Sequence, residues 1–163
     1  MLEANIDADI VLYRCAAASE NDSYEVACHR LEDMMQGILN RLDTTLYRAF
    51  ISGGKNFRYD IDPQYKANRK KDRGTSSFDW NEAFRILNLI REEIGENFPY
   101  KVIKIDGCEA DDVIGTLVIK KSRVDFNPEK IMIVSSDRDF VQLQRFPNVR
   151  QFSPILKKEI VEK

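Results

Sequence analysis

The sequence predicts an α/β protein with a central, mainly parallel sheet flanked by helices. Strand-like segments alternate with helix-like segments along the 163 residues, as expected where crossover helices connect parallel strands. Groups of acidic residues follow three of the predicted strands, at the position where open parallel sheets bind their ligands. The length is sufficient for one domain with its own hydrophobic core.

The predicted strands are short and rich in apolar residues. Four apolar residues in succession at 131–134 indicate a strand that is buried on both faces. Glycines 53 and 54 end the predicted strand at 45–51, and a proline at 128 marks a turn before the strand at 130–134. Strands are expected at residues 2–7, 45–51, 100–105, 130–134 and 149–152.

Helices are predicted where apolar residues recur every three or four positions. Ser23 is a suitable N-cap for a long helix, and Trp80, Phe84 and Leu87 mark the apolar face of another. Helices are expected at residues 10–18, 23–42, 78–96 and 111–123, with a short one at 139–144. Residues 56–77 are polar, basic and without apolar periodicity, so we expect them to be mostly loop.

Composition excludes several classes of protein. No apolar run approaches the roughly 18–20 residues that span a bilayer, and the N-terminus lacks the features of a signal peptide. The three scattered cysteines fit neither a disulfide framework nor a zinc site. We therefore expect no membrane partner and a cytoplasmic location, the host cytoplasm if the protein is phage-encoded.

The acidic groups at the strand ends are the candidate site. They comprise Asp7 and Asp9; Glu109, Asp111 and Asp112; and Asp137 and Asp139. Carboxylates gathered in one volume raise one another's pKa, and a divalent cation offsets that repulsion. Mg²⁺ and Mn²⁺ prefer oxygen ligands, and a pair of such ions can activate water and stabilise the leaving oxygen of a phosphodiester.

Each acidic group also has a structural interpretation, because acids at helix N-termini cap the helix and favour its dipole. This alternative stays open for Asp111, Asp112 and the Asp137-Arg138-Asp139 step. We expect Asp9 to be structural or peripheral, and Asp7 to be the better metal ligand.

A basic segment accompanies the acids. The net charge of the chain is −2, but residues 55–73 contain seven Lys or Arg and three Asp, a local net charge of +4. Cations here could bind phosphates and Tyr65 could stack on a base, although a solvated basic loop is the simpler alternative. The candidate nucleic-acid contacts are Arg58, Tyr65, Lys66, Arg69, Lys70 and Lys71.

These segments together resemble the 5′ nucleases, which include flap endonucleases and the 5′-nuclease domains of bacterial DNA polymerases. The resemblance is greatest to the 5′-to-3′ exonucleases of tailed phages. The matching segments, in the family's order, are residues 6–9 (IDAD), 56–58 (NFR), 62–70 (DPQYKANRK), 109–115 (EADDVIG) and 135–140 (SSDRDF).

The resemblance implies a PIN-like fold and a two-metal mechanism that uses Mg²⁺ or Mn²⁺. It implies hydrolysis of DNA with 5′ ends or flaps, or of RNA in hybrids, by Lys66, Arg69 and Asp111 as catalytic residues. The implied first metal site contains Asp7, Glu109, Asp111 and Asp112, and the second contains Asp137 and Asp139. Tyr65, Lys66 and Arg69 would lie at the base of an arch within residues 55–77 that the family threads with single-stranded DNA.

The chain departs from the family pattern in two places. Residues 50–54 (FISGG) lack the aspartate that usually follows the second strand, and the helix-hairpin-helix region is absent after Lys163. A truncation, a split gene whose other half is a separate C-terminal nuclease subunit, and a degenerate protein are the alternatives. The competing function is a non-catalytic nuclease fold that binds DNA or a partner protein; a small PIN-type ribonuclease is a weaker one.

Overall fold

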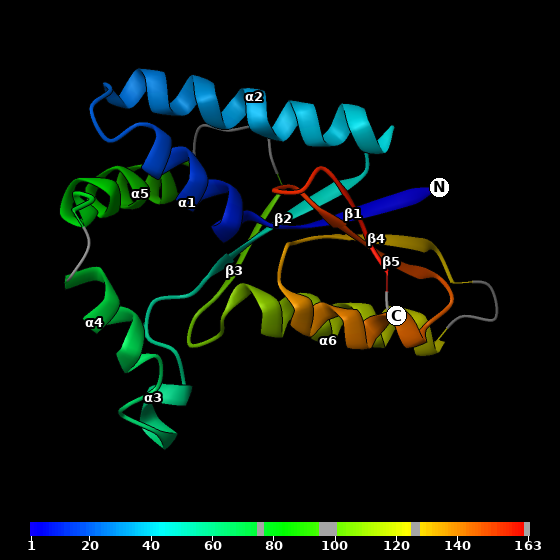
Figure 1. Ribbon diagram of the computed structural model, residues 1–163. Coiled ribbons are helices and arrows are strands. Elements are labelled where there is room, and N and C mark those ends of the chain that lie inside the picture. The colour runs from blue at the N-terminus through cyan, green and yellow to red at the C-terminus, as the bar shows by residue number, and fades with distance from the viewer. Residues whose placement is uncertain (75–76, 95–100, 125–127, 162–163) are drawn as a thin grey trace.

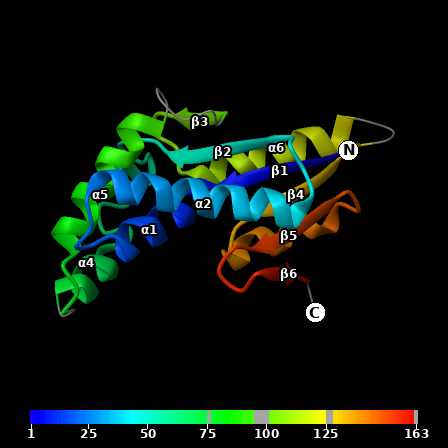
Figure 2. The same cartoon turned by 90° about the horizontal axis from the view of Figure 1, so that it is seen from above.

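The computed structural model describes residues 1–74, 77–94, 101–124 and 128–161. Its centre is a six-stranded sheet with the strand order β3-β2-β1-β4-β5-β6. The strands are β1 (Leu2–Asp7), β2 (Tyr47–Ser52), β3 (Val102–Ile105), β4 (Lys130–Val134), β5 (Val149–Ser153) and β6 (Lys158–Ile160). The pairings among β1 to β5 are all parallel, and the pairing of β5 with β6 is antiparallel. Figure 2 shows them side by side in this order.

Helices cover both faces of the sheet (Figure 1). One face carries α1 (Ala8–Ala18), α2 (Tyr24–Leu42) and α5 (Trp80–Ile94), and the other carries α6 (Ala110–Val124) and the 3₁₀ helix η1 (Arg138–Arg145). The short helices α3 (Arg58–Ile61) and α4 (Ala67–Gly74) extend away from the sheet. Within these ranges, no helix combines the length and apolar character needed to cross a bilayer.

The core is divided by the sheet into two apolar layers. In β4, Met132 and Val134 belong to the layer under α1, α2 and α5, whereas Ile131 and Ile133 belong to the layer under α6. This alternation follows from the two-residue repeat of a strand, and it explains the unbroken apolar run of β4. The predicted burial of this strand on both faces is thereby confirmed.

The central strand β1 is apolar on one side and polar on the other. Ala4 and Ile6 pack into the layer of α1, α2 and α5. Glu3, Asn5 and Asp7 therefore point to the α6 side, where all three are buried. A polar row inside a sheet requires partners, and the carboxyl end of this row is the candidate site.

Most predicted elements are confirmed, with shifts of one or two residues at their ends. Ser23 caps α2 by accepting a hydrogen bond from the Val26 amide, at 3.4 Å. The helix predicted from residue 10 begins at Ala8, directly after the strand, so Asp9 lies in its first turn. Residues 95–96 and 100 of the predicted elements lie outside the described ranges. The strand β6 was not predicted.

The expectation that residues 56–77 are mostly loop is wrong, because α3 and α4 lie within them. The physical reason is that α4 has no buried apolar stripe: among its described side chains only Arg73 is partly buried. A helix that packs no face into the core lacks the apolar period by which sequence reveals a helix.

Candidate metal centre and nucleic-acid interface

Asp7 is the last residue of β1 and the most buried acid of the site. Only 7% of its surface is exposed, and its Oδ2 accepts a hydrogen bond of 2.9 Å from the Ser135 hydroxyl at the end of β4. The pKa of Asp7 is raised to about 7, mainly by burial and also by the nearby charges of Asp9 and Asp111, against the lowering effect of the Ser135 hydrogen bond. A cation bound here would offset both the cost of burying the Asp7 charge and its repulsion by the neighbouring carboxylates.

The acids at the start of α6 form the tightest carboxylate group among the described residues. One oxygen from each of Glu109, Asp111 and Asp112 lies within 4.8 Å of the others, as ligands of one ion must. Burial raises the pKa of Asp111, and the charges of Glu109 and Asp112 add to the effect. The sequence predicted this group, and the structure brings it together.

The N-terminus of α6 is held in place by short-range hydrogen bonds. The Asp112 carboxylate accepts a hydrogen bond of 3.1 Å from the backbone amide of Glu109. This contact corresponds to one of the two hydrogen bonds of a capping box, the one made by the third residue of the helix. The Ser52 hydroxyl, from the end of β2, accepts from the Ala110 amide at 3.0 Å. Capping and a potential metal-binding role thus coexist at Asp112.

Ser52 is the last residue of β2, in the segment that lacks the aspartate usual in the family. Its backbone amide donates to Asp9 Oδ2 at 3.1 Å, so Asp9 supports the end of β2 as well as the first turn of α1. This contact agrees with the structural role expected of Asp9, and Asp9 also lines the cavity described below.

Cations from the basic segment contact two of these acids directly. The guanidinium of Arg58 donates to both oxygens of Asp112, at 2.6 and 2.7 Å, and Lys66 Nζ lies 2.5 Å from Glu109 Oε1. The Tyr65 hydroxyl donates to Glu109 Oε2 at 3.2 Å. Hydrogen bonds from Arg58 hold the pKa of Asp112 below its usual range. The pKa of Lys66 is raised, because its pairing with Glu109 outweighs its burial.

Asp7, Asp9, Lys66, Glu109 and Asp111 line one cavity of about 1020 Å³, whereas Arg58, Tyr65 and Asp112 do not line it. Its wall combines three kinds of side chain from α1, the basic segment, the start of α5 and the strand ends. The acids are Asp7, Asp9, Asp79, Glu109, Asp111 and Asp137; the cations are Arg14, Lys66, Arg69 and Arg73; the aromatic residues are Tyr13, Tyr59, Phe78, Trp80 and Phe84.

The second predicted metal pair is only half inside this cavity. Asp137 lines it, while its Oδ1 accepts from the Asp139 amide at 2.9 Å and so caps η1. Asp139 is exposed and does not line the cavity. Lys71 is exposed on α4 outside the cavity, and the Lys70 side chain lies outside the described part of the chain.

Sequence reasoning missed three groups of this wall. Arg14 is a single cation in an apolar helix, and Arg73 belongs to the basic segment but to none of the matching motifs, so no local pattern placed either of them on the cavity wall. Trp80 and Phe84 were assigned to an apolar helix face, which is correct for Phe84 but incomplete, because both rings also line the cavity. Phe78 precedes the helix and gave no periodic signal.

Comparison with known proteins places this chain in a nuclease family. Residues 5–163 match the 5′-3′ exonuclease N-terminal resolvase-like domain. The Ribonuclease H of Enterobacteria phage T4 is 44% identical over 102 residues, which cover 63% of this chain and 32% of that protein. The 5′-3′ exonuclease of Buchnera aphidicola subsp. Schizaphis graminum is 32% identical over 145 residues, covering 85% of this chain and 47% of that protein.

Solved structures share the fold. A complex of the bacteriophage T5 flap endonuclease with DNA and metal ions superposes with a TM-score of 0.74 at 20% identity, over 99% of this chain and 58% of that one. The T5 5′-exonuclease with bound zinc superposes with a TM-score of 0.72 at 18% identity, over the same shares of the two chains. The PIN-like α/β prediction is confirmed. The chain spans about a third to a half of the length of these curated relatives.

Proposed function

Because this chain belongs to the 5′-3′ exonuclease family, we propose that it is a divalent-metal-dependent nuclease domain acting on DNA with 5′ ends or flaps. The observation that carries the proposal is the close group of Glu109, Asp111 and Asp112, of which Glu109 and Asp111 line one cavity together with Asp7, Lys66 and Arg69. RNA in hybrids is a second substrate class, in keeping with the Ribonuclease H that this chain resembles.

The donor set fits Mg²⁺ or Mn²⁺. All candidate ligands are carboxylate oxygens, which hard divalent cations prefer. Burial, with the neighbouring carboxylates adding to it, raises the pKa of Asp7 and of Asp111, and a bound cation would offset both effects. We assign Asp7, Glu109, Asp111 and Asp112 to the first ion, and Asp137 with Asp139 to a second, for which Asp139 has to turn toward the cavity. A bound ion would supply an activated water and charge neutralisation at the phosphate.

The chain's own residues bind and orient the substrate. Lys66 and Arg69 lie on the cavity wall, where they can hold the scissile phosphate and offset the charge that develops on it. Arg58, Tyr65, Lys70 and Lys71 extend the basic segment from which we expect further phosphate and base contacts. Ser135 keeps Asp7 oriented toward the acids of α6.

Cleavage of 5′-flapped DNA in Mg²⁺ tests this proposal, with the chain alone and with a C-terminal nuclease subunit supplied separately. Asp111→Asn should lower the rate at least about a hundredfold, since it removes a central ligand. Asp106→Asn is the matched control, because Asp106 is an exposed aspartate five residues upstream that lies outside the cavity. Titration with Mn²⁺ measures the metal affinity of both variants independently of cleavage, and only Asp111→Asn should lower that affinity.

Two results would overturn the proposal. One is unchanged cleavage by Asp111→Asn. The other is the absence of cleavage by the wild-type chain even with the C-terminal subunit present, while metal-independent DNA binding persists. The latter result would establish the non-catalytic alternative, which the serine at position 52 and the outward position of Asp139 favour.

A further inference from the structure

The segment that follows β4, residues 135–137, carries one candidate metal ligand and supports another. Asp137 lines the cavity, and the Ser135 hydroxyl donates to Asp7 Oδ2 at 2.9 Å. The oxygen of the same hydroxyl accepts from the Asp137 amide at 3.1 Å. One buried serine therefore connects the acid that we assign to the first ion with an acid that we assign to the second.

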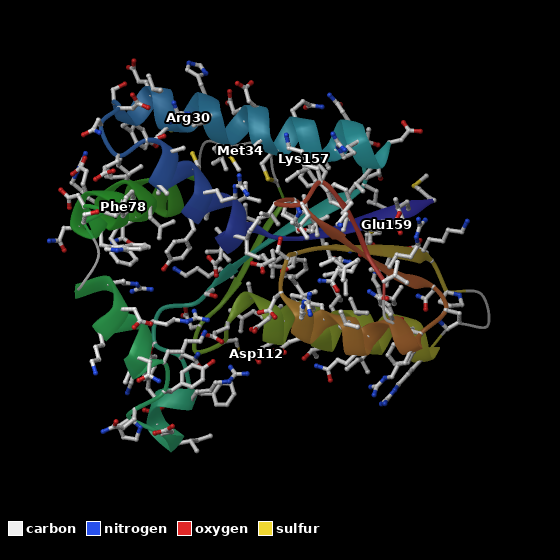
Figure 3. All side chains as sticks on the ribbon, viewed as in Figure 1. Arg30, Met34, Phe78, Asp112, Lys157 and Glu159 are labelled. Carbon is white, nitrogen blue, oxygen red and sulfur yellow. The ribbon has the colours of Figure 1, made fainter. Side chains whose placement is uncertain are left out.

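The neighbouring strand β5 holds this segment as it leaves the sheet. The Ser135 amide donates to the Phe152 carbonyl at 3.0 Å, and the hydroxyl oxygens of Ser136 and Ser153 lie 2.7 Å apart. Figure 3 labels Glu159 on β6, the strand on the other side of β5. All of β5 is described, and none of its residues lines the cavity, so the strand acts on the site only through its neighbours.

Gln151 of β5 makes the most deeply buried of these contacts. Its side chain is fully buried, and its Nε2 atom donates to the carbonyl of Asp137 at 2.6 Å and to that of Ser135 at 3.0 Å. Both hydrogens of the amide are thereby used on the backbone beyond the end of β4. A segment held at its first and third carbonyls is restricted in the positions that it can give the Asp137 carboxylate.

Core packing does not account for an amide at this position. Gln151 pairs across the sheet with Ile133, an apolar residue of the layer under α6. The Oε1 atom of Gln151 is shielded from solvent and has no hydrogen-bond partner among the described residues, which costs stability. An apolar side chain would avoid that cost, so the amide is better explained by the two carbonyls that it holds.

We propose that Gln151 is a positioning residue of the metal centre, which fixes Asp137 for the second ion and, through Ser135, fixes Asp7 for the first. Gln151 acts through the backbone of residues 135–137 and touches neither an ion nor the DNA. Loss of a hydrogen bond behind a metal ligand typically weakens metal binding by about tenfold to a hundredfold. This inference rests on the proposed function and adds to its site a residue that lies outside the cavity.

Calorimetric titration with Mn²⁺, without DNA, tests the effect on the metal. Gln151→Met keeps the length of the side chain but removes both donors, so it should weaken Mn²⁺ binding about tenfold to a hundredfold. Asn148→Leu is the matched control. Asn148 also donates twice, to Ser122 Oγ at 3.1 Å and to the Glu129 carbonyl at 3.0 Å, and its Oδ1 also has no partner among the described residues. It lies at the other end of β5, so Asn148→Leu should keep the wild-type affinity.

Amide hydrogen exchange in EDTA tests the positioning without a metal. The amides of Asp137 and Asp139 donate to Ser135 Oγ and to Asp137 Oδ1. Both should exchange about tenfold faster or more in Gln151→Met, because the segment then opens more often. In Asn148→Leu they should exchange at the wild-type rate.

A conservative variant separates the hydrogen bonds from the packing. Gln151→His keeps one N–H donor at the same number of bonds from Cα, so it should recover part of the Mn²⁺ affinity that Gln151→Met loses. Urea unfolding verifies that each variant is folded. If Gln151→Met does not fold, Gln151→His carries both measurements, with a smaller loss of affinity expected.

The outcomes separate this inference from the nuclease proposal. Wild-type Mn²⁺ affinity in a folded variant of Gln151, or an equal loss in Asn148→Leu, overturns the positioning role and leaves the nuclease proposal as it stands. Absence of Mn²⁺ binding by the wild-type chain overturns the metal centre, and the exchange rates then decide separately whether Gln151 positions Asp137.

Discussion

At the scale of the residue, Asp112 shows how the acidic site is held together by cations. Both of its oxygens are engaged by Arg58, and one of them also accepts from the Glu109 amide. Lys66 pairs with one oxygen of Glu109. A bidentate guanidinium–carboxylate pair is among the stronger polar contacts in proteins. A metal ion that binds Asp112 therefore has to compete with Arg58, and the basic segment and the metal site are coupled through this pair.

Arg58→Gln should accordingly raise the affinity for Mn²⁺ by about threefold to tenfold, because it removes the competing cation and leaves the acids more negative. The affinity can be measured by titration with Mn²⁺ in a calorimeter. Lys71→Gln is the control, since Lys71 is an exposed cation of the same segment and is expected to leave the affinity unchanged. An affinity that falls in Arg58→Gln would mean that Arg58 orients Asp112 for the metal and does not compete with it.

At the scale of the element, the end of β2 runs very close to the end of β3. The Gly53 amide donates to the Cys108 carbonyl at 2.8 Å, and the Phe57 amide donates to the Gly107 carbonyl at 2.9 Å. A Cβ added at Gly53 would overlap the carbonyl oxygen of Ile105 and lie 3.0 Å from the Asp106 Cα. This close approach of two backbones places Glu109 and the start of α6 beside Ser52.

Gly53→Ala should lower the free energy of unfolding by about 1–3 kcal/mol, because the overlap is with backbone and cannot be relieved by a side-chain rotation. The neighbouring Gly54→Ala should change it by less than about 1 kcal/mol, since nothing lies within 4 Å of an added Cβ there. Urea unfolding of both variants makes the comparison. Equal losses at the two positions would contradict the importance of the contact.

At the scale of the whole molecule, the polar row of β1 connects two charged clusters at its opposite ends. Asp7 lies at the carboxyl end, and Glu3, only 1% exposed, lies near the other. Lys121 on α6 donates to Glu3 at 2.5 Å, and Arg48 on β2 also pairs with it. This cluster links the sheet to α6 at the end distant from the site. Burial acts to raise the pKa of Glu3, but its bonds to Lys121 and Arg48 prevail, so the pKa lies below its usual value.

Because the folded pKa of Glu3 is depressed, its stabilising contribution is complete above the unfolded pKa of about 4.3 and is lost as the pH falls through the lower folded value. Glu3→Gln should lower the free energy of unfolding by about 2 kcal/mol at pH 7. The difference between the two proteins should shrink below about pH 4. Chemical unfolding across pH 3–8 measures both effects. A difference that does not depend on pH would show that Glu3 contributes through packing and not through its charge.

The order of elements and the acid group of α6 could be predicted from the sequence, because both depend on short-range patterns. The unbroken apolar run of β4 and the alternation in β1 report burial directly, and Glu109, Asp111 and Asp112 share one helix turn. The helices of the basic segment could not be predicted, since α4 has no apolar face that would produce a helical period in the sequence. The pairing of Arg58 with Asp112 joins residues 54 apart, which no local pattern reports.

By itself the sequence determined the α/β class, the family and the identity of the acids at the strand ends, because strand and helix periods and motif spacing are local properties of the chain. Only the tertiary structure decided which acids converge and which cations hold them. It set Asp7 and Asp111 in one cavity, left Asp139 outside it, and gathered Arg73, Phe78 and Trp80 on its wall. The physical reason is that burial, electrostatic repulsion and stacking depend on distances between segments, and the sheet order and helix docking set those distances.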